Sequence, residues 1–202
     1  MDFQEIKKYY KDKFESFGHT AQGMDWKDKA SQYLRFEIIS KYMDFNSSPT
    51  ILDVGCGSSE FLNFCLINKL QCNYKGLDIT EEMVASSNNR FGPNTAVLGD
   101  LFTFQSNEQF DYVIASGTFN AKLNSDNENW KLFFYDNLLK MFEKSKKGIV
   151  FNCMSEHVDW TYDRLYYPNI SNLTAFIVEK LSRKFVIDHS YDLYEMTVYI
   201  SK

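Results

Sequence analysis

The chain has 202 residues, and 44% of them are hydrophobic, which is enough to bury the core of one globular domain. Its formal net charge at pH 7 is −5, and this acidic balance argues against binding to the phosphate backbone of a nucleic acid. No apolar run reaches the roughly 18 residues of a membrane-spanning helix, and the N-terminus lacks the pattern of a signal peptide. We therefore expect a single cytoplasmic domain over residues 1–202, with no membrane partner.

The cysteines form neither a C-x-x-C pair nor a cluster with histidine, which argues against a structural zinc site and for a reducing compartment. They are Cys56, Cys65, Cys72 and Cys153. We expect no metal in this protein.

Residues 1–46 precede the first predicted strand and are expected to be helical. Apolar side chains recur near helical spacing over residues 2–17, and a second helix is predicted from Trp26 to about Met43, with Asp25 as its N-cap. Such a segment can fold over the open edge of a sheet and exclude water from a reacting centre. We therefore expect a helical lid over residues 1–46 and an α/β core over residues 47–202.

The stretch from Ile51 to Phe61 combines a short apolar strand, a turn of small residues and the start of a helix. Gly55 and Gly57 let the backbone approach a ligand closely, and the following helix offers free N–H groups at its positive end. This pattern is typical of a loop that holds a nucleotide-like ligand after the first parallel strand.

Polar side chains follow the next three predicted strands. Asp78 ends the second strand at the offset where carboxylates bind ribose hydroxyls, and Asp100 follows the third. The fourth strand changes abruptly from apolar residues to small polar ones at Ser116. Because ligands bind beyond the carboxyl ends of parallel strands, we expect these side chains and Asp53 to face one crevice.

These motifs resemble those of the class I S-adenosylmethionine-dependent methyltransferases. The resemblance covers residues 50–120 and includes four elements: the D-x-G-x-G loop (Asp53, Gly55, Gly57), the acid Asp78, the G-D pair Gly99-Asp100, and the F-D-x-V strand from Phe110 to Val113. It implies a Rossmann-like, mostly parallel seven-stranded sheet, with the last strand antiparallel and helices on both faces. Trp26 and the Gln32-x-x-Arg35-Phe36 element are similar to the pre-sheet helix of a bacterial subgroup of this family.

The resemblance also implies roles for single residues. The glycine loop and Asp53 would hold the methionine end of S-adenosylmethionine, Asp78 the ribose, and Asp100 with Leu101 the adenine. The cofactor-binding residues predicted in this way are Asp53, Gly55, Cys56, Gly57, Asp78, Ile79, Met83, Asp100, Leu101 and Ser116, and the product would be S-adenosylhomocysteine.

A nicotinamide-dependent dehydrogenase is the competing interpretation of the glycine loop. Its G-x-G-x-x-G fingerprint needs a small third residue for close helix–strand packing, and Glu60 stands at that position. Asp53 would also place a negative charge near the pyrophosphate, whereas the same carboxylate suits the ammonium and sulfonium groups of S-adenosylmethionine. Both observations favour the methyltransferase.

Methyl transfer to a hydroxyl requires an oriented nucleophile and a group that takes its proton. His157 is the preferred base because it follows the fifth strand and its pKa can lie near neutrality, although an ordinary surface histidine is an open alternative. Glu195 and Tyr194 are further catalytic candidates, and Glu195 could instead form a strand-end charge pair. The candidate substrate-binding residues are Trp26, Arg35, Asn120, Tyr166 and Tyr167.

The segment Ser116-Gly-Thr-Phe119 stands where the base-modifying amino methyltransferases carry a proline-rich motif, so methylation of base amino groups is disfavoured. We therefore predict methyl transfer to a small molecule, preferably to a hydroxyl of a sugar or sugar nucleotide. An RNA or protein methyltransferase and a non-catalytic S-adenosylmethionine-binding partner remain alternatives. The chain is expected to be a monomer or a homodimer.

Overall fold

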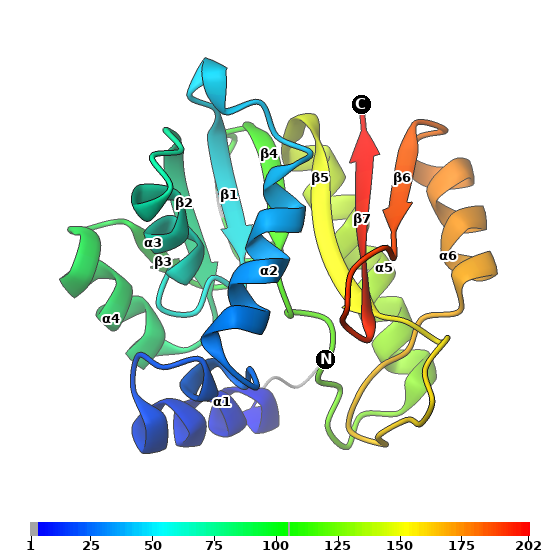
Figure 1. The fold of residues 1–202 in the computed structure, drawn as a ribbon, viewed down its shortest axis with the longest axis horizontal. Coiled ribbons are helices and arrows are strands. Elements are labelled where there is room, and N and C mark those ends of the chain that lie inside the picture. The colour runs from blue at the N-terminus through cyan, green and yellow to red at the C-terminus, as the bar shows by residue number, and fades with distance from the viewer. Residues whose placement is uncertain (1–3, 105) are drawn as a thin grey trace.

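The computed structural model describes residues 4–104 and 106–202. Within them, seven strands form one sheet of order β3-β2-β1-β4-β5-β7-β6, with helices on both faces (Figure 1). The strands are β1 (Thr50–Val54), β2 (Asn73–Asp78), β3 (Ala96–Leu98), β4 (Phe110–Ala115), β5 (Ser145–Met154), β6 (Phe185–Asp188) and β7 (Glu195–Ser201). The helices are α1 (Gln4–Phe17), α2 (Lys29–Ser40), α3 (Glu60–Ile67), α4 (Glu81–Phe91), α5 (Asn127–Lys144) and α6 (Ile170–Phe176), and the short turns are η1 (Gln22–Met24), η2 (Phe45–Ser47) and η3 (Ile177–Leu181). This arrangement confirms the predicted Rossmann-like sheet.

The strand pairing places one crevice near the middle of the sheet. β1 pairs in parallel with both β2 and β4, so the strand order reverses between β1 and β4. Ligands of open α/β sheets bind at such a switch point, beyond the carboxyl ends of the strands. β7 runs antiparallel to both β5 and β6, which confirms the prediction for the last strand.

Alternation along each central strand divides the core between the two faces of the sheet. Leu52 and Val113 belong to a cluster with Trp130 and Phe134 of α5, whereas Ile51 belongs to a second cluster with side chains of α2 and α3. Neighbouring residues of a strand point to opposite faces, so both faces of β1 and β4 are covered. The near-continuous apolar runs in the sequence are thereby explained.

Residues 4–46 form two different parts. α2 packs against α3, β5 and β7, so it belongs to a helical layer of the core. α1 and η1 instead lie at the end of the sheet where the parallel strands finish (Figure 1). Residues 2 and 3 of the predicted first helix lie outside the described residues.

The predicted N-cap of the second helix is wrong by three residues. Asp28 caps α2, because its carboxylate accepts a hydrogen bond from the Ser31 backbone N–H at 2.7 Å. Asp25 ends η1 in the left-handed conformation, with φ of 60°, and its side chain is free to bind elsewhere. Among the described residues, no helix has the length and apolar character needed to cross a bilayer.

Candidate active site

The glycine loop after β1 is in close contact with two other segments. Gly55 and Gly57 have φ values of 70° and 54°, a region that favours glycine. A Cβ atom on Gly55 would lie 2.5 Å from Thr118 Oγ1, and one on Gly57 would lie 2.8 Å from Met24 Sδ. Both glycines are therefore required by the backbone conformation and by the space available.

The acid at the end of β2 is joined directly to this loop. Asp78 Oδ2 accepts a hydrogen bond from the Gly57 backbone N–H at 2.8 Å, and Oδ1 accepts one from the Thr80 N–H at 2.9 Å. Burial raises the pKa of the Asp78 carboxyl, and these backbone hydrogen bonds partly oppose that effect. Asp78 is thus fixed at the crevice predicted from the sequence.

Asp53 is a second buried carboxyl beside the loop. Its side chain is 3% exposed and accepts a hydrogen bond from the Tyr74 hydroxyl at 2.8 Å. Burial raises the pKa of Asp53 to about 7; the hydrogen bond from Tyr74 opposes the rise, and the charge of Asp78 adds to it. A cationic ligand would stabilise the ionised form of this carboxyl.

The two residues that were predicted to bind the adenine, Asp100 and Leu101, lie in different surroundings after β3. Asp100 Oδ1 accepts hydrogen bonds from the backbone N–H groups of Phe102 and Thr103, both at 2.8 Å, and Asp100 lines the main cavity. Leu101 packs in the core and does not belong to the cavity lining.

A cavity of about 460 Å³ lies beyond the carboxyl ends of the strands. It extends from Gly99 and Asp100 after β3, across the glycine loop, to Met154 of β5 and Glu195 of β7. Apart from Leu101, all the predicted cofactor residues line it: Asp53, Gly55, Cys56, Gly57, Asp78, Ile79, Met83, Asp100 and Ser116.

Unpaired buried oxygens point to a ligand in this cavity. Four buried side-chain oxygens of the described residues lack a hydrogen-bond partner. Three of them, Thr80 Oγ1, Ser116 Oγ and Asn120 Oδ1, belong to residues that line the cavity. Buried polar atoms in folded proteins are usually paired, so these three suit a polar ligand.

The predicted substrate and catalytic residues are only partly brought together. Trp26, Arg35, Asn120, Tyr194 and Glu195 line the cavity. His157 is exposed and absent from the lining, so the structure gives no support to its predicted role as a base. The sequence placed His157 after a strand but could not show that the chain turns outward there.

Tyr166 and Tyr167 also lie outside the main cavity. The ring of Tyr166 packs against Phe134 in the core, and the Tyr167 hydroxyl accepts a hydrogen bond from the Tyr162 N–H at 3.1 Å. Both residues line a separate cavity of about 490 Å³.

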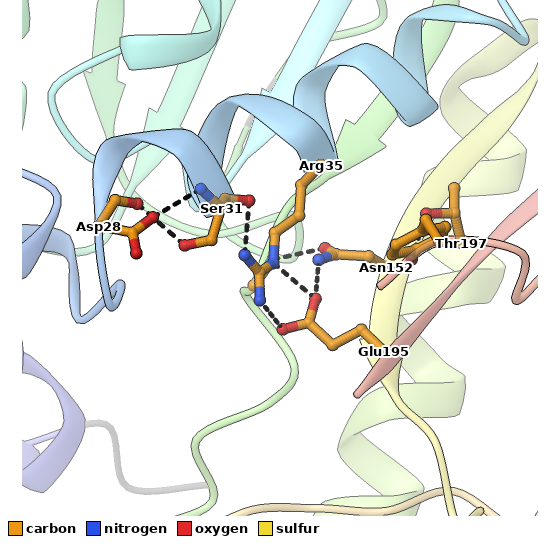
Figure 2. Close-up of polar contacts among 8 residues, drawn as sticks. Asp28, Ser31, Arg35, Asn152, Glu195 and Thr197 are labelled. Carbon is orange, nitrogen blue, oxygen red and sulfur yellow. Dashed lines mark hydrogen bonds and ion pairs between the residues drawn. The ribbon is translucent and has the colours of Figure 1, made fainter. Parts of the chain in front are cut away.

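Arg35 and Glu195 bind each other, as Figure 2 shows. Arg35 Nε and Nη2 donate to the two carboxylate oxygens of Glu195 at 2.9 and 2.5 Å, and Asn152 Nδ2 donates to the same carboxylate. Arg35 is 7% exposed and Glu195 is 3% exposed. This pairing leaves neither group free for the predicted roles of substrate clamp and base.

Asp192 was not predicted as a site residue. In the described part of the chain, it is the lining carboxylate that makes no hydrogen bond or ion pair. The sequence feature that could have identified Asp192 is its position just before β7, in the connection that reaches the edge of the crevice. No group of three or more potential metal-ligating side chains occurs among the described residues.

Polar contacts fasten α1 and η1 over the cavity. Asp25 lines the cavity and forms ion pairs with Lys13 of α1 and with Arg164, each at 3.0 Å. It also accepts a hydrogen bond from the Tyr9 hydroxyl at 2.8 Å, and burial together with this contact raises the pKa of Tyr9 to about 12. On the other side, Lys11 pairs with Glu82 of α4. Asp25 therefore joins α1 and η1, the two elements that would form a lid over the cavity, to the loop after β5.

Comparisons with known proteins agree with this geometry. The sequence profile of a family described as a methyltransferase domain matches residues 52–140. Rv1506c of Mycobacterium tuberculosis, a protein named as a methyltransferase, is 29% identical over 155 residues, which are 76% of this chain and 93% of that protein.

Two solved structures share the fold. The magnesium protoporphyrin IX methyltransferase of Synechocystis PCC 6803, solved with S-adenosylmethionine, has a TM-score of 0.63 and 14% identity over 97% of this chain and 96% of that one. DhpI, solved with S-adenosylhomocysteine, has a TM-score of 0.65 and 15% identity over 98% and 95% of the two chains. The crevice geometry, the matched methyltransferase domain and the relative together support the assignment of the chain as a class I S-adenosylmethionine-dependent methyltransferase.

Proposed function

We propose that this methyltransferase transfers the methyl group of S-adenosylmethionine to a hydroxyl of a small, uncharged acceptor. The observation that carries the proposal is a cavity lined by two kinds of group. One set is the glycine loop with the acids Asp53, Asp78 and Asp100, and the other is a set of aromatic and aliphatic side chains. Such a cavity suits a charged cofactor beside an apolar-faced acceptor.

The first set of residues fits the cofactor. The unpaired oxygens of Thr80 and Ser116 offer hydrogen bonds, and the glycine loop lines the cavity beside them. Asp78 would bind the ribose and Asp100 the adenine end. Asp53 would stabilise the positive charges of the methionine end, since a buried carboxylate gains most from a nearby cation.

The apolar part of the lining supports an acceptor with an apolar face. It includes Trp130, Phe133, Met154 and Leu193. At its rim, Tyr194 is 49% exposed, and its ring centroid lies 5.6 Å from that of Trp160, which is 55% exposed. Exposed aromatic rings of this kind bind flat molecules and the apolar faces of sugars.

The charges of the cavity disfavour a polyanionic acceptor. The lining carboxylates are Asp25, Asp53, Glu60, Asp78, Asp100, Asp192 and Glu195, and the lining cations are Lys27, Arg35 and Arg164. Arg35 pairs with Glu195 and Arg164 pairs with Asp25, so Lys27 is the lining cation without a carboxylate partner among the described residues. A neutral sugar or ring-bearing alcohol fits this lining better than an RNA or a diphosphate-linked sugar nucleotide.

The chemistry requires little from the chain beyond positioning. When bound, S-adenosylmethionine supplies a methyl group on a positively charged sulfur. The acceptor oxygen forms a bond to the methyl carbon while the carbon–sulfur bond breaks, and the hydroxyl proton must leave. Asp192 is our candidate to take this proton, because this exposed residue lines the cavity and its carboxylate makes no hydrogen bond or ion pair with the described residues.

Calorimetric titration with S-adenosylmethionine and S-adenosylhomocysteine tests the cofactor site, and a panel of hydroxylated small molecules tests the acceptor by mass spectrometry. We expect micromolar cofactor binding and methylation of a neutral sugar or aromatic alcohol. RNA and protein substrates in the same assay test the alternative acceptors. Cofactor binding without turnover on any acceptor would favour a non-catalytic partner protein, and absence of binding would overturn the proposal.

A further inference from the structure

Five residues form a closed ring of contacts at one wall of the cavity. The Gly117 N–H donates to Asn152 Oδ1 at 2.7 Å, and Asn152 Nδ2 donates to Glu195. Glu195 holds Arg35 by two hydrogen bonds, and the Arg35 guanidinium carbon lies 4.2 Å from the Trp26 ring centroid. The indole of Trp26 lies against Gly117, because a Cβ atom added to Gly117 would lie 2.5 Å from the indole ring.

The ring joins segments that are far apart in the sequence. Trp26 lies between η1 and α2, Arg35 is in α2, Gly117 follows β4, Asn152 is in β5, and Glu195 begins β7. Arg35 is further fixed from its own helix, because Nη1 donates to the Ser31 carbonyl at 2.7 Å (Figure 2). The guanidinium therefore has one defined orientation.

Stability alone does not account for this buried ion pair. Removing two charges from water costs free energy that their attraction often fails to recover, and apolar replacements of similar volume are often equally stable. A bidentate pair does, however, fix direction, because the planar guanidinium matches the two carboxylate oxygens. The pair is better suited to orienting its neighbours than to stabilising the fold.

The groups that the ring orients belong to the cavity. Trp26 and Gly117 both line it, and Gly117 follows Ser116, whose buried hydroxyl has no hydrogen-bond partner in the described structure. Without the ion pair, the Trp26 ring would lose the guanidinium packed against it, although the loop after β4 would keep the hydrogen bonds from Gly117 to Asn152 and from Thr118 to Val54. The wall beside the Ser116 hydroxyl would then lose its defined shape.

We infer that Arg35 and Glu195 are positioning residues, which hold Trp26 against Gly117 and thereby preform the cavity wall that the cofactor contacts. The inference rests on the proposed cofactor site. It replaces the roles of substrate clamp and base that the sequence suggested for these two residues. They act through Trp26 and Asn152 and do not touch the reacting atoms.

The double substitution Arg35→Met/Glu195→Leu tests this role, since it removes the ion pair without leaving an unpaired buried charge. We expect the thermal midpoint to stay near that of the wild type while the affinity for S-adenosylhomocysteine falls about tenfold. Lys140→Met/Glu143→Leu, which removes an exposed pair on α5, is the matched control and should bind as the wild type does. Arg35→Lys should retain only part of the wild-type affinity for S-adenosylhomocysteine, because an ammonium group cannot bind both carboxylate oxygens of Glu195 and also face the indole of Trp26.

A spectroscopic measurement separates positioning from stability. In protein labelled with 5-fluorotryptophan, the fluorine signal of Trp26 is identified by its loss in Trp26→Phe. We expect this signal to shift in the double variant and to broaden, while the signals of Trp130 and Trp160 keep their positions.

Different results would contradict the inference and the proposed function. Wild-type affinity and an unchanged Trp26 signal in the folded double variant would overturn the inference. Should that variant fail to fold, Trp26→Phe decides: reduced affinity supports the inference, and wild-type affinity overturns it. Failure of the wild-type protein to bind S-adenosylhomocysteine would instead contradict the proposed function.

Discussion

The backbone N–H of Gly57 donates a hydrogen bond to the Asp78 carboxylate at 2.8 Å, so the loop after β1 and the acid that ends β2 form one unit. The carboxylate holds the loop in place and would also bind the ribose of the cofactor. A substitution of Asp78 should therefore affect the cofactor site twice, through the lost ligand contact and through a looser loop.

Asp78→Ala is expected to weaken the binding of S-adenosylhomocysteine by about tenfold or more, because hydrogen bonds to a charged group contribute about 1.5–3 kcal/mol. Asp78→Asn keeps one acceptor atom and should lose less. Asp44→Ala provides the control, since Asp44 caps η2 and is absent from the cavity lining. Equal calorimetric affinities of Asp78→Ala and the control would contradict this role.

The raised pKa of Asp53 predicts a pH dependence of stability. This pKa rises from 3.8 to about 7 in the folded protein, so between these values the folded state keeps a proton that the unfolded state has lost. The free energy of unfolding should therefore fall as the pH rises through this window, by up to about 1.4 kcal/mol per pH unit from this group. Asp53→Asn, which cannot ionise, should lack this contribution.

Urea unfolding of both proteins at several pH values within that window measures the difference. The buried Asp78 carboxyl contributes with the same sign in both proteins. Because the charges of Asp53 and Asp78 interact, the difference between the two curves measures Asp53 together with that interaction. Parallel curves for the wild type and Asp53→Asn would show that the carboxyl is ionised throughout.

Asp192→Asn is expected to lower kcat by about 100-fold, at the low end of the range for general bases, if its carboxylate takes the acceptor proton. Binding of S-adenosylhomocysteine should stay unchanged, because Asp192 makes no hydrogen bond or ion pair with the described residues. Asp163→Asn, a change to an exposed acid outside the main cavity, is the control. An unchanged kcat would remove Asp192 from the mechanism.

The contacts of Asp25 predict how firmly the lid is held. Asp25→Asn weakens two ion pairs and one hydrogen bond that join α1, η1 and Arg164. Exposed pairs contribute about 0.2–1 kcal/mol each, and the partly buried Asp25 carboxylate places these pairs at the upper end of that range. We expect faster amide hydrogen exchange in α1, with β1 unaffected, and a dissociation rate of S-adenosylhomocysteine raised about threefold.

Asp12→Asn is the matched control for the lid, because the pair of Lys8 and Asp12 lies within α1 and connects it to nothing else. Hydrogen exchange in α1 that is equal in the two variants would show that Asp25 does not fasten the lid. High salt should reproduce the effect of Asp25→Asn in the wild-type protein, since it screens exposed charges.

The central sheet could be predicted from the sequence, and so could the gathering of most of the proposed cofactor residues at one cavity, because both are encoded locally. Apolar runs define β1 and β4, and the glycines and acids lie within a few residues of the strand ends. The start of α2 was misplaced because Asp25 and Asp28 both suit an N-cap, and only the hydrogen bond to Ser31 decides between them.

The acceptor side could not be predicted in the same way. Glu195 and Arg35 were recognised as polar residues near the crevice. Their ion pair joins two segments that are distant in the sequence, and local sequence patterns do not predict such contacts. Tyr166 looked like part of a pocket wall because its loop is aromatic, whereas its ring packs into the core beside α5. His157 follows a strand, yet the direction of the chain beyond β5 depends on packing that the local sequence does not specify.

Arg35 and Glu195 form an ion pair although they lie 160 residues apart in the sequence, and Glu195 begins β7, the last strand of the sheet in chain order. A chain synthesised from its N-terminus exposes Trp26 and Arg35 long before Glu195 has left the ribosome. The glycine loop, Asp78 at the end of β2 and Asp100 after β3 can assemble earlier, because their contacts are closer in sequence. A nascent chain would thus carry a half-built cofactor site, and the wall formed by Trp26 would close only after Glu195 has emerged from the ribosome.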